Sequence, residues 1–278
     1  MAPGVRIADC QQVMDSNPRF KTLYAFDYHF LVPKLTCTEV WPLKDLVRAS
    51  GQVIFDVGAS HGAWTKAWLD TFGPAVEQVH LFEPLPGNAA QIRDKLKIGF
   101  FDEHVAGLSS RLVLNKFGIG DSVGTGTLNF NHATSGLSSF AQSACTLPDR
   151  VVQLDRSVDV PVRTLDDYCL EKSIDRIDLV KIDTEGFELN VLRGGLGLFE
   201  RQAVSVVIFE FGSHQVAQNH SFCDFYEFFT DYGYRMFQLG LGKQGWKRMM
   251  IDQYEERFED FSDTWMFGAC LPGINNDV

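Results

Sequence analysis

Short apolar runs alternate with segments of helical periodicity along the chain from residue 53 onward. The runs 53–57, 79–84 and 204–212 are rich in Val, Ile and Phe, which favour β-strands. The segments 63–72 and 86–97 follow the first two runs and have the spacing of helices. This alternation predicts an α/β fold, doubly wound around a mostly parallel sheet.

The later part of the chain continues the pattern less regularly. Further strands are expected at 111–120, at 124–130 as a hairpin arm, at 177–186 with a loop at its end, at 234–239 and at 264–271. Further helices are expected after Thr164, at 188–201 and at 222–232. Residues 131–150 are rich in Ser, Ala, Thr and Gly and predict a mobile loop that closes over a bound substrate. The last strands predict a C-terminal antiparallel hairpin.

Two regions differ in character, which predicts the domain organisation. Residues 1–50 contain a cluster of aromatic residues between 20 and 30, and Pro33 and Pro42 interrupt any long helix. We expect this part to be an N-terminal flanking or lid segment. Residues 51–278 are expected to form one main domain, and no internal repeat is visible in the sequence.

The charge balance argues against nucleic acid as a partner. The chain of 278 residues has 25 Lys and Arg against 36 Asp and Glu, a formal net charge of −11, and no basic run offsets it. Affinity for nucleic acid comes largely from basic side chains that neutralise phosphates. No segment approaches the ~18 apolar residues of a membrane span. The scattered cysteines lack zinc or disulfide spacing and predict reduced thiols. We therefore expect a cytoplasmic protein, and the sequence leaves its oligomeric state open.

The segment VIFDVGASHG, residues 53–62, predicts a ligand site. It is a strand that ends in an acid and breaks into a turn with Gly58 and Gly62 before a helix. Glycines at such a turn let the backbone approach a ligand beyond the carboxyl end of the strand. Asp56 would repel a pyrophosphate but suits a cofactor that carries an ammonium and a sulfonium. The turn therefore favours S-adenosylmethionine.

Three predicted strands end in an acid: Asp56, Glu83 and Asp183. The carboxyl ends of parallel strands meet at one edge of a sheet, so these carboxylates are expected to converge. An alternative is that each acid only caps the helix that follows it. Glu83 lies near the spacing at which an acid on the second strand accepts both hydroxyls of a ribose, a feature shared with dehydrogenases.

Several motifs together resemble one family. The segments DVGASHG, FEPLPGN, FGIGDSVGTGTL, VRTLDDY, LVKIDTEGFELNVLRGG and VIFEF occur in the order and rough spacing of the FkbM-type S-adenosylmethionine-dependent methyltransferases. The resemblance covers residues 54–211 and, more weakly, 265–267. It implies a class I methyltransferase (Rossmann-like) fold for residues 51–278. It also implies O-methylation of a hydroxyl on a sugar, glycan or related natural product, with a small-molecule or glycan acceptor.

The resemblance and the chemistry of the cofactor assign binding residues. Asp56, Gly58 and Ser60 are expected to contact the methionine portion of S-adenosylmethionine, and Glu83 its ribose. Asp121 is expected to accept the adenine amine, as acids at this location do in many class I enzymes. The alternative for Asp121 is a residue of the turn before Ser122.

Methylation of an alcohol needs a group that removes the hydroxyl proton. Asp183 and Glu185 in the loop after one strand, and His214 just past the end of the next, are the candidates, and we favour His214 over Glu185 as the base. The alternative for His214 is a solvated loop histidine. A second mechanism uses Asp183, Glu210 and a nearby acid to hold a divalent cation such as Mg²⁺; the sequence requires no metal.

Two other classes of protein remain as alternatives. The segment GLGKQG, residues 240–245, matches the dinucleotide-binding pattern and would indicate an NAD-dependent oxidoreductase. It lies late in the chain and opens no clear helix, so we predict a hairpin turn there. A non-catalytic cofactor-binding module is the other alternative. The aromatic residues of 222–232 are expected in the core, although they could stack on a sugar ring.

Overall fold

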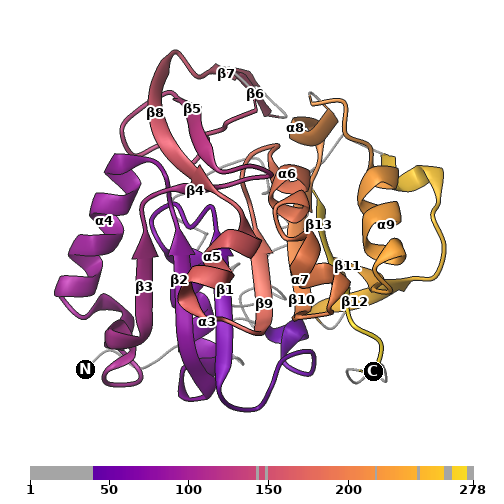
Figure 1. Ribbon diagram of the computed structural model, residues 1–278, viewed down its shortest axis with the longest axis horizontal. Helices are drawn as coiled ribbons and strands as arrows, with labels where there is room; N and C mark the ends of the chain where they lie inside the picture. The colour runs from indigo at the N-terminus through magenta and orange to yellow at the C-terminus, as the bar shows by residue number, and fades with distance from the viewer. Residues whose placement is uncertain are drawn as a thin grey trace.

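A computed structural model of the protein describes residues 40–141, 144–147, 150–216, 218–242, 245–259 and 265–273 (Figure 1). Residues 1–39, and with them most of the expected N-terminal segment 1–50, lie outside the described residues.

The main sheet has eight strands in the order β12-β11-β13-β10-β9-β1-β2-β3. Their bounds are β1 Gln52–Val57, β2 Val76–Phe82, β3 Leu112–Asn115, β9 Ile177–Ile182, β10 Val204–Phe211, β11 Arg235–Gly242, β12 Gly245–Ile251 and β13 Trp265–Cys270. The five strands from β3 to β10 are parallel, while β13, β11 and β12 pair antiparallel. The mostly parallel sheet with C-terminal antiparallel strands is confirmed. Strands β11 and β12 pair antiparallel up to Gly242 and Gly245, on either side of the turn expected at 240–245.

Helices cover both faces of this sheet (Figure 1). They are α3 Ala63–Phe72, α4 Pro86–Lys97, α5 Leu165–Lys172, α6 Glu188–Arg193, α7 Leu196–Glu200, α8 Ser213–Val216 and α9 Phe222–Asp231. Short 3₁₀ helices lie at η2 Trp41–Leu43, η3 Gly73–Ala75, η4 Phe100–Asp102, η5 Leu108–Arg111 and η6 Glu256–Glu259. Buried side chains of α5, α6, α7 and α9 form one core, and those of α3 and α4 form another on the opposite face. The doubly wound arrangement is therefore confirmed.

An insertion between β3 and β9 lies above the carboxyl ends of the parallel strands (Figure 1). It consists of a sheet in the order β4-β8-β5, with β4 Gly118–Ile119, β5 Gly124–Phe130 and β8 Arg156–Arg163, and a hairpin of β6 Ala144–Leu147 and β7 Arg150–Gln153. The single strand expected at 111–120 is wrong, because it divides between two sheets. The expectation of a loop throughout 131–150 is also wrong, since β6 and β7 pair within it.

The helix expected at 188–201 is divided by Gly194 and Gly195. A Cβ on Gly194 would lie 2.0 Å from the carbonyl oxygen of Gly120. The backbone of the insertion therefore packs directly on this break, which only glycine permits. By contrast, the helix after Thr164 begins as expected, because the Thr164 side chain accepts a hydrogen bond from the Asp167 amide.

The segment that leads into β1 is packed on the main sheet. Val40, Leu43 and Leu46 are buried in the core beside α3. Arg48 Nε lies 2.8 Å from a carboxylate oxygen of Asp178, whose side chain is buried at the start of β9. Residues 40–50 of the flanking segment therefore pack on the main domain and form an ion pair with it.

The predicted core aromatics and thiols agree with the structure where it describes them. Phe222, Phe225 and Phe229 of α9 are fully buried, which confirms the core interpretation. Cys169, Cys223 and Cys270 are free thiols. Among the described residues no helix has both the length and the apolar character needed to cross a membrane.

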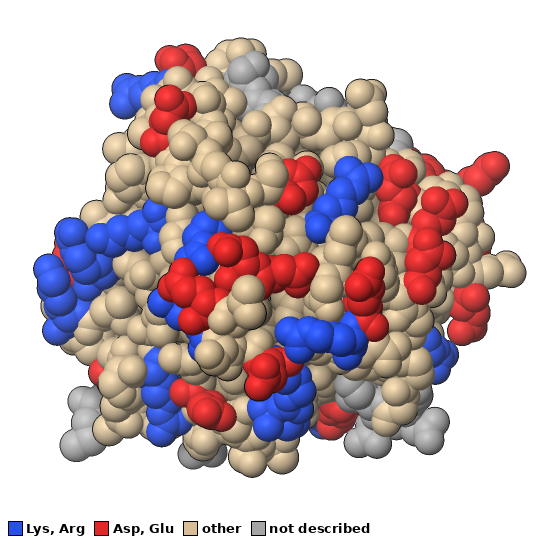
Figure 2. All heavy atoms as spheres, viewed as in Figure 1, with Lys and Arg blue, Asp and Glu red and all other residues tan. Residues whose placement is uncertain are grey.

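Charge is distributed unevenly over the face in Figure 2. Lys and Arg side chains gather over α4, and Asp and Glu gather over α9, with mixed charges between them. The two ends of this face therefore differ in sign.

Candidate active site

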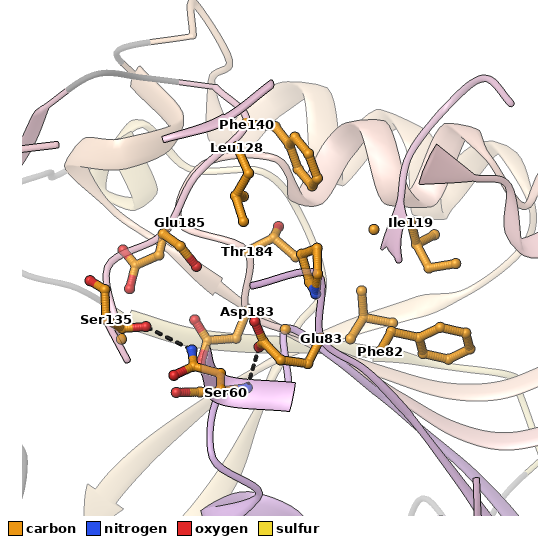
Figure 3. Close-up of a pocket in the computed structure, with 17 residues that line it drawn as sticks. Ser60, Phe82, Glu83, Ile119, Leu128, Ser135, Phe140, Asp183, Thr184 and Glu185 are labelled. Carbon is orange, nitrogen blue, oxygen red and sulfur yellow. Dashed lines mark hydrogen bonds between the residues drawn. The ribbon is translucent and has the colours of Figure 1, made fainter. Parts of the chain in front are cut away.

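The predicted convergence of strand-end residues is seen at the carboxyl ends of β1, β2 and β9 (Figure 3). A pocket there is lined by Gly58, Ser60, Glu83, Asp183, Glu185 and, from the insertion, Phe140, among others. Five of the expected site residues therefore share one pocket. The insertion forms its opposite wall.

Glu83 lies at the centre of the pocket and is almost fully buried. Its Oε2 accepts a hydrogen bond from the Ser60 amide at 2.7 Å, and its Oε1 accepts one from the Leu85 amide at 2.8 Å (Figure 3). Burial raises the pKa of Glu83 to about 8, although these two amides favour the ionised form. A carboxylate has about four lone-pair positions, so this one retains capacity for further donors.

The turn after β1 is shaped by two residues in the left-handed region, Gly58 with φ of 75° and Ser60 with φ of 49°. The amides of Gly58 and Ala59 both donate to the carbonyl oxygen of Phe82, at 3.0 and 3.1 Å. A Cβ on Gly58 would lie only 1.8 Å from the carbonyl oxygen of Asp183. Glycine is required at this position because the two loops touch through their backbones.

Lys181 joins the acids of two strands. Its Nζ lies 3.2 Å from a carboxylate oxygen of Asp56 and 3.2 Å from one of Asp183, and it donates to the Gly58 carbonyl at 3.0 Å. Burial lowers the pKa of Lys181, but the charges of Asp183 and Asp56 outweigh burial and raise it. Asp56 also accepts a hydrogen bond from Thr65 at 2.7 Å and does not line the pocket. Its carboxylate therefore lies outside the pocket and stabilises the turn through Lys181, which binds the Gly58 carbonyl.

His214 and Glu185 form a pair where β9 and β10 end. His214 Nδ1 lies 2.7 Å from Glu185 Oε2, and both side chains are mostly buried. Burial lowers the pKa of His214, but the hydrogen bond that His214 donates to Glu185 and the charges of Glu185, Glu188 and Asp183 outweigh burial, so the pKa is raised. His214 itself is not among the residues that line the pocket, whereas Glu185 is.

Negative charge accumulates around this pair. One ligand atom each from Glu185, Glu210 and His214 lies within 4.8 Å of the others, a spacing that could hold a metal ion. Burial raises the pKa of Glu210 well above its usual range, and the nearby charges of Asp183 and Glu185 raise it further. Glu185 and Glu210 can therefore be stabilised either by binding protons or by binding a cation together with His214.

The comparison with family models identifies the chain. Residues 56–236 match the model of the methyltransferase FkbM domain, which is most of the chain. The protein belongs to the FkbM methyltransferase family. It is therefore an S-adenosylmethionine-dependent methyltransferase with a class I methyltransferase-like α/β fold, as the motifs indicated.

Individual relatives of this methyltransferase are distant. It is 29% identical over 163 residues to the 2-O-methyltransferase NoeI of Sinorhizobium fredii, and this match covers 55% of the chain and 61% of that protein. The crystal structure of methyltransferase FkbM from Methylobacillus flagellatus KT has 16% identity and a TM-score of 0.49, covering 92% of this chain and 60% of that one. A precorrin-6y C5,15-methyltransferase from Geobacter metallireducens has 13% identity and a TM-score of 0.43, covering 84% and 87%.

Asp121 lies apart from the other expected site residues of the methyltransferase. It is exposed, it accepts a hydrogen bond from Asn190 Nδ2 at 2.8 Å, and it does not line the pocket. Its position follows from the division of the third strand, because Asp121 follows β4 in the smaller sheet. The turn interpretation accounts for its contact with Ser122 at 3.2 Å.

Residues 131–141 contribute contacts that the sequence did not predict. Asn88 Nδ2 donates to the Ser135 carbonyl at 2.8 Å (Figure 3). Ser139 Oγ donates to the Glu185 carbonyl at 2.7 Å. The segment is thus hydrogen-bonded both to the start of α4 and to the loop after β9. Hydrogen bonds between such distant segments leave no pattern in one sequence, although Asn88 lies inside the motif FEPLPGN.

Proposed function

We propose that this methyltransferase transfers a methyl group to a hydroxyl of a sugar, glycan or related natural product, with His214 as the general base. The contact of 2.7 Å between His214 Nδ1 and Glu185 Oε2, at the edge of the cofactor pocket, carries the proposal. The named activity of the distant relative, a 2-O-methyltransferase, supports an oxygen acceptor.

The pocket residues fit the methyl donor. The remaining acceptor positions of Glu83 suit the two ribose hydroxyls, and the turn at Gly58 and Ser60 suits the methionine portion. Asp56 supports that turn through Lys181, which differs from the direct contact expected from the sequence. When bound, S-adenosylmethionine supplies an electrophilic methyl group.

The pair of His214 and Glu185 suits proton removal from an alcohol. Glu185 accepts the hydrogen bond of Nδ1–H and leaves Nε2 as the basic nitrogen. In our proposal Nε2 would take the proton of the acceptor hydroxyl, whose oxygen would react with the methyl group that the bound donor supplies. Alignment of the acceptor with the methyl group supplies the rest of the rate enhancement.

Replacement of the base tests this proposal. We expect His214→Ala to lower kcat by about 10²- to 10⁴-fold, the usual contribution of a general base. Calorimetry should show unchanged affinity for S-adenosylhomocysteine. His104→Ala is the control, since His104 lies on the surface near Asp70, 3.7 Å away. Full activity of His214→Ala on a glycan that the wild type methylates would remove His214 as the base.

A divalent cation at Glu185, Glu210 and His214 is the second candidate mechanism, favoured by the spacing of their ligand atoms. A set with one imidazole suits Mn²⁺ or Zn²⁺ better than the Mg²⁺ expected from the sequence. We prefer the base mechanism, and predict that dialysis against EDTA leaves kcat unchanged. Loss of activity that Mn²⁺ or Zn²⁺ restores would favour the cation.

A further inference from the structure

A buried carboxylate that the mechanism does not use holds the loop after β9. Glu188, in the first turn of α6, is fully buried. Its side chain accepts hydrogen bonds from the Thr184 amide at 2.8 Å, from Thr184 Oγ1 at 3.0 Å and from the Gly186 amide at 3.1 Å. Between these two residues lies Glu185, which has φ of 56°. Glu188 therefore stabilises the left-handed conformation that turns the Glu185 side chain toward His214.

Gln215 extends this network to the loop after β10. Its Oε1 accepts from the Gly212 amide at 2.7 Å, and its Nε2 donates to the Glu210 carbonyl at 3.1 Å. An amide N–H only donates and a carbonyl only accepts, so these two contacts fix the orientation of the side-chain amide. The second Nε2 hydrogen is then directed to Glu188 Oε2, 2.6 Å away. Gln215 is almost fully buried, so water cannot readily replace these bonds.

We propose that Glu188 and Gln215 are positioning residues that set the contact between Glu185 and His214. This inference rests on the proposed function, in which that pair removes the proton. Each of the two residues neighbours one member of the pair: Glu188 binds both amides flanking Glu185, and Gln215 directly follows His214. Their own hydrogen bond therefore joins the two loops and fixes the separation between the base and its partner.

The electrostatic surroundings of His214 make this positioning measurable. The charged groups near it are Glu185, Glu188 and Asp183, and Glu210 lies in the same cluster with Lys181 close by. Burial alone lowers the pKa of His214, and the hydrogen bond that His214 donates to Glu185 is the main effect that raises it. Movement of Glu185 away from the imidazole should therefore lower the pKa of His214.

Gln215→Met tests the inference, because methionine has similar volume but cannot form these hydrogen bonds. NMR titration of the His214 imidazole should show a lower pKa than in the wild type. We expect kcat to fall by about tenfold to a hundredfold, as for other residues that orient a functional side chain. Affinity for S-adenosylhomocysteine should stay unchanged. An unchanged His214 titration in the folded variant would overturn the inference.

Gln52→Met is the matched control. Gln52 is also almost fully buried and forms two side-chain hydrogen bonds, to the Arg48 carbonyl at 2.6 Å and from Trp68 Nε1 at 3.3 Å. It lies at the start of β1, at the other end of the strand from the site. We expect a lower Tm with no change in the His214 titration. A shift of the same size in this control would show that any loss of buried hydrogen bonds moves the titration, and would also overturn the inference.

Glu188→Gln is the second variant, and it carries the test if Gln215→Met does not fold. The new side-chain NH₂ would face either the Thr184 amide or Gln215 Nε2, which only donate, so at least one bond is lost while the shape is kept. Loss of the Glu188 charge lowers the pKa of His214 by itself. In this variant the readout is therefore kcat at a pH at which His214 is neutral in both proteins, where we expect a decrease of about tenfold to a hundredfold. Asp166→Asn is its control, since Asp166 likewise accepts from two amides, those of Gly197 and Leu198 at 2.8 and 2.9 Å, away from His214.

The imidazole titration separates this inference from the proposed function. If His214→Ala keeps full activity, the proposed base is wrong, but the titration in Gln215→Met still decides whether the two residues position His214. If the titration is unchanged while His214→Ala is inactive, the base stands and the positioning inference fails.

Discussion

The two sides of the pocket differ in how their charges are balanced. On the donor side, formed by the loops after β1 and β2, Asp56 has Lys181 and Thr65 as partners, and Glu83 has two backbone amides. On the base side, formed by the loops after β9 and β10, Glu185 and Glu210 lie close together with one histidine. The carboxylates of the donor side are thus bound to separate partners in the protein, whereas those of the base side gather around one imidazole.

This difference shows how one sheet edge supports two tasks. A binding surface gains from donors and acceptors that are already fixed, because less ordering is needed when the ligand arrives. A proton acceptor instead needs a pKa close to the working pH, and neighbouring carboxylates adjust that of an imidazole. The two sides are in backbone contact at Gly58 and Asp183. A substitution at this contact is the first test of the comparison.

The largest effect is expected from Gly58→Ala. The added Cβ would lie 1.8 Å from the Asp183 carbonyl, at a residue with positive φ, so both sides must move. We expect the free energy of unfolding to fall by about 3 kcal/mol or more from overpacking and backbone strain. Gly107→Ala is the control, because Gly107 has φ of 82° but nothing within 4 Å of the added Cβ. Equal losses in urea denaturation would show that the two sides are not in close contact.

A smaller effect is expected from Glu83→Gln, which tests the donor side alone. The variant should bind S-adenosylhomocysteine about tenfold to a hundredfold more weakly, the usual contribution of hydrogen bonds to a charged group. Because the pKa of Glu83 is about 8, the free wild type holds a proton there below that pH. Ribose hydroxyls favour the ionised form, so affinity should increase as pH rises toward 8 and then level off.

Calorimetry between pH 6 and 9 would measure this dependence, with Glu83→Gln as the reference for the titration of the ligand's own amine. Identical pH dependence in the two proteins would contradict the role of Glu83 in ribose binding.

The smallest effect is expected from Asp121→Ala. Because Asp121 is exposed and bound to Asn190, its loss should change cofactor affinity less than about twofold, as is usual for surface substitutions. A decrease in affinity of more than tenfold would indicate that Asp121 binds the adenine, as expected from the sequence. The donor side would then include a residue of the smaller sheet.

Local signals predicted much of the fold, and contacts between distant segments limited the rest. Helices α3 and α4 have the predicted bounds, because Gly62 and Pro86 mark where they begin. The division of the helix at 188–201 depends on the close approach of Gly194 to Gly120, which no local pattern records. Strand β6 lies within the segment 131–150, which is rich in Ser, Ala, Thr and Gly, and it is recognised only through its pairing with β7.

The site was predictable to a similar extent. Because parallel strands share one carboxyl edge, Glu83 and Asp183 were correctly expected to converge. Asp121 was expected at the end of the third strand of this sheet, but the strand before it, β4, belongs to the smaller sheet. Glu188 lies within the motif KIDTEGFE, but its role depends on Gln215, and that contact exists only once β9 and β10 are paired.

The place of β13 in the main sheet has a consequence for biosynthesis. This strand pairs with β10 on one side and β11 on the other, although it follows both in the chain. While the ribosome is still translating the codons for residues 211–265, the apolar strand β10 has an open edge and the β11–β12 hairpin has no sheet to join. The nascent polypeptide therefore exposes an open strand edge, of the kind that favours aggregation, until β13 has been synthesised and has paired.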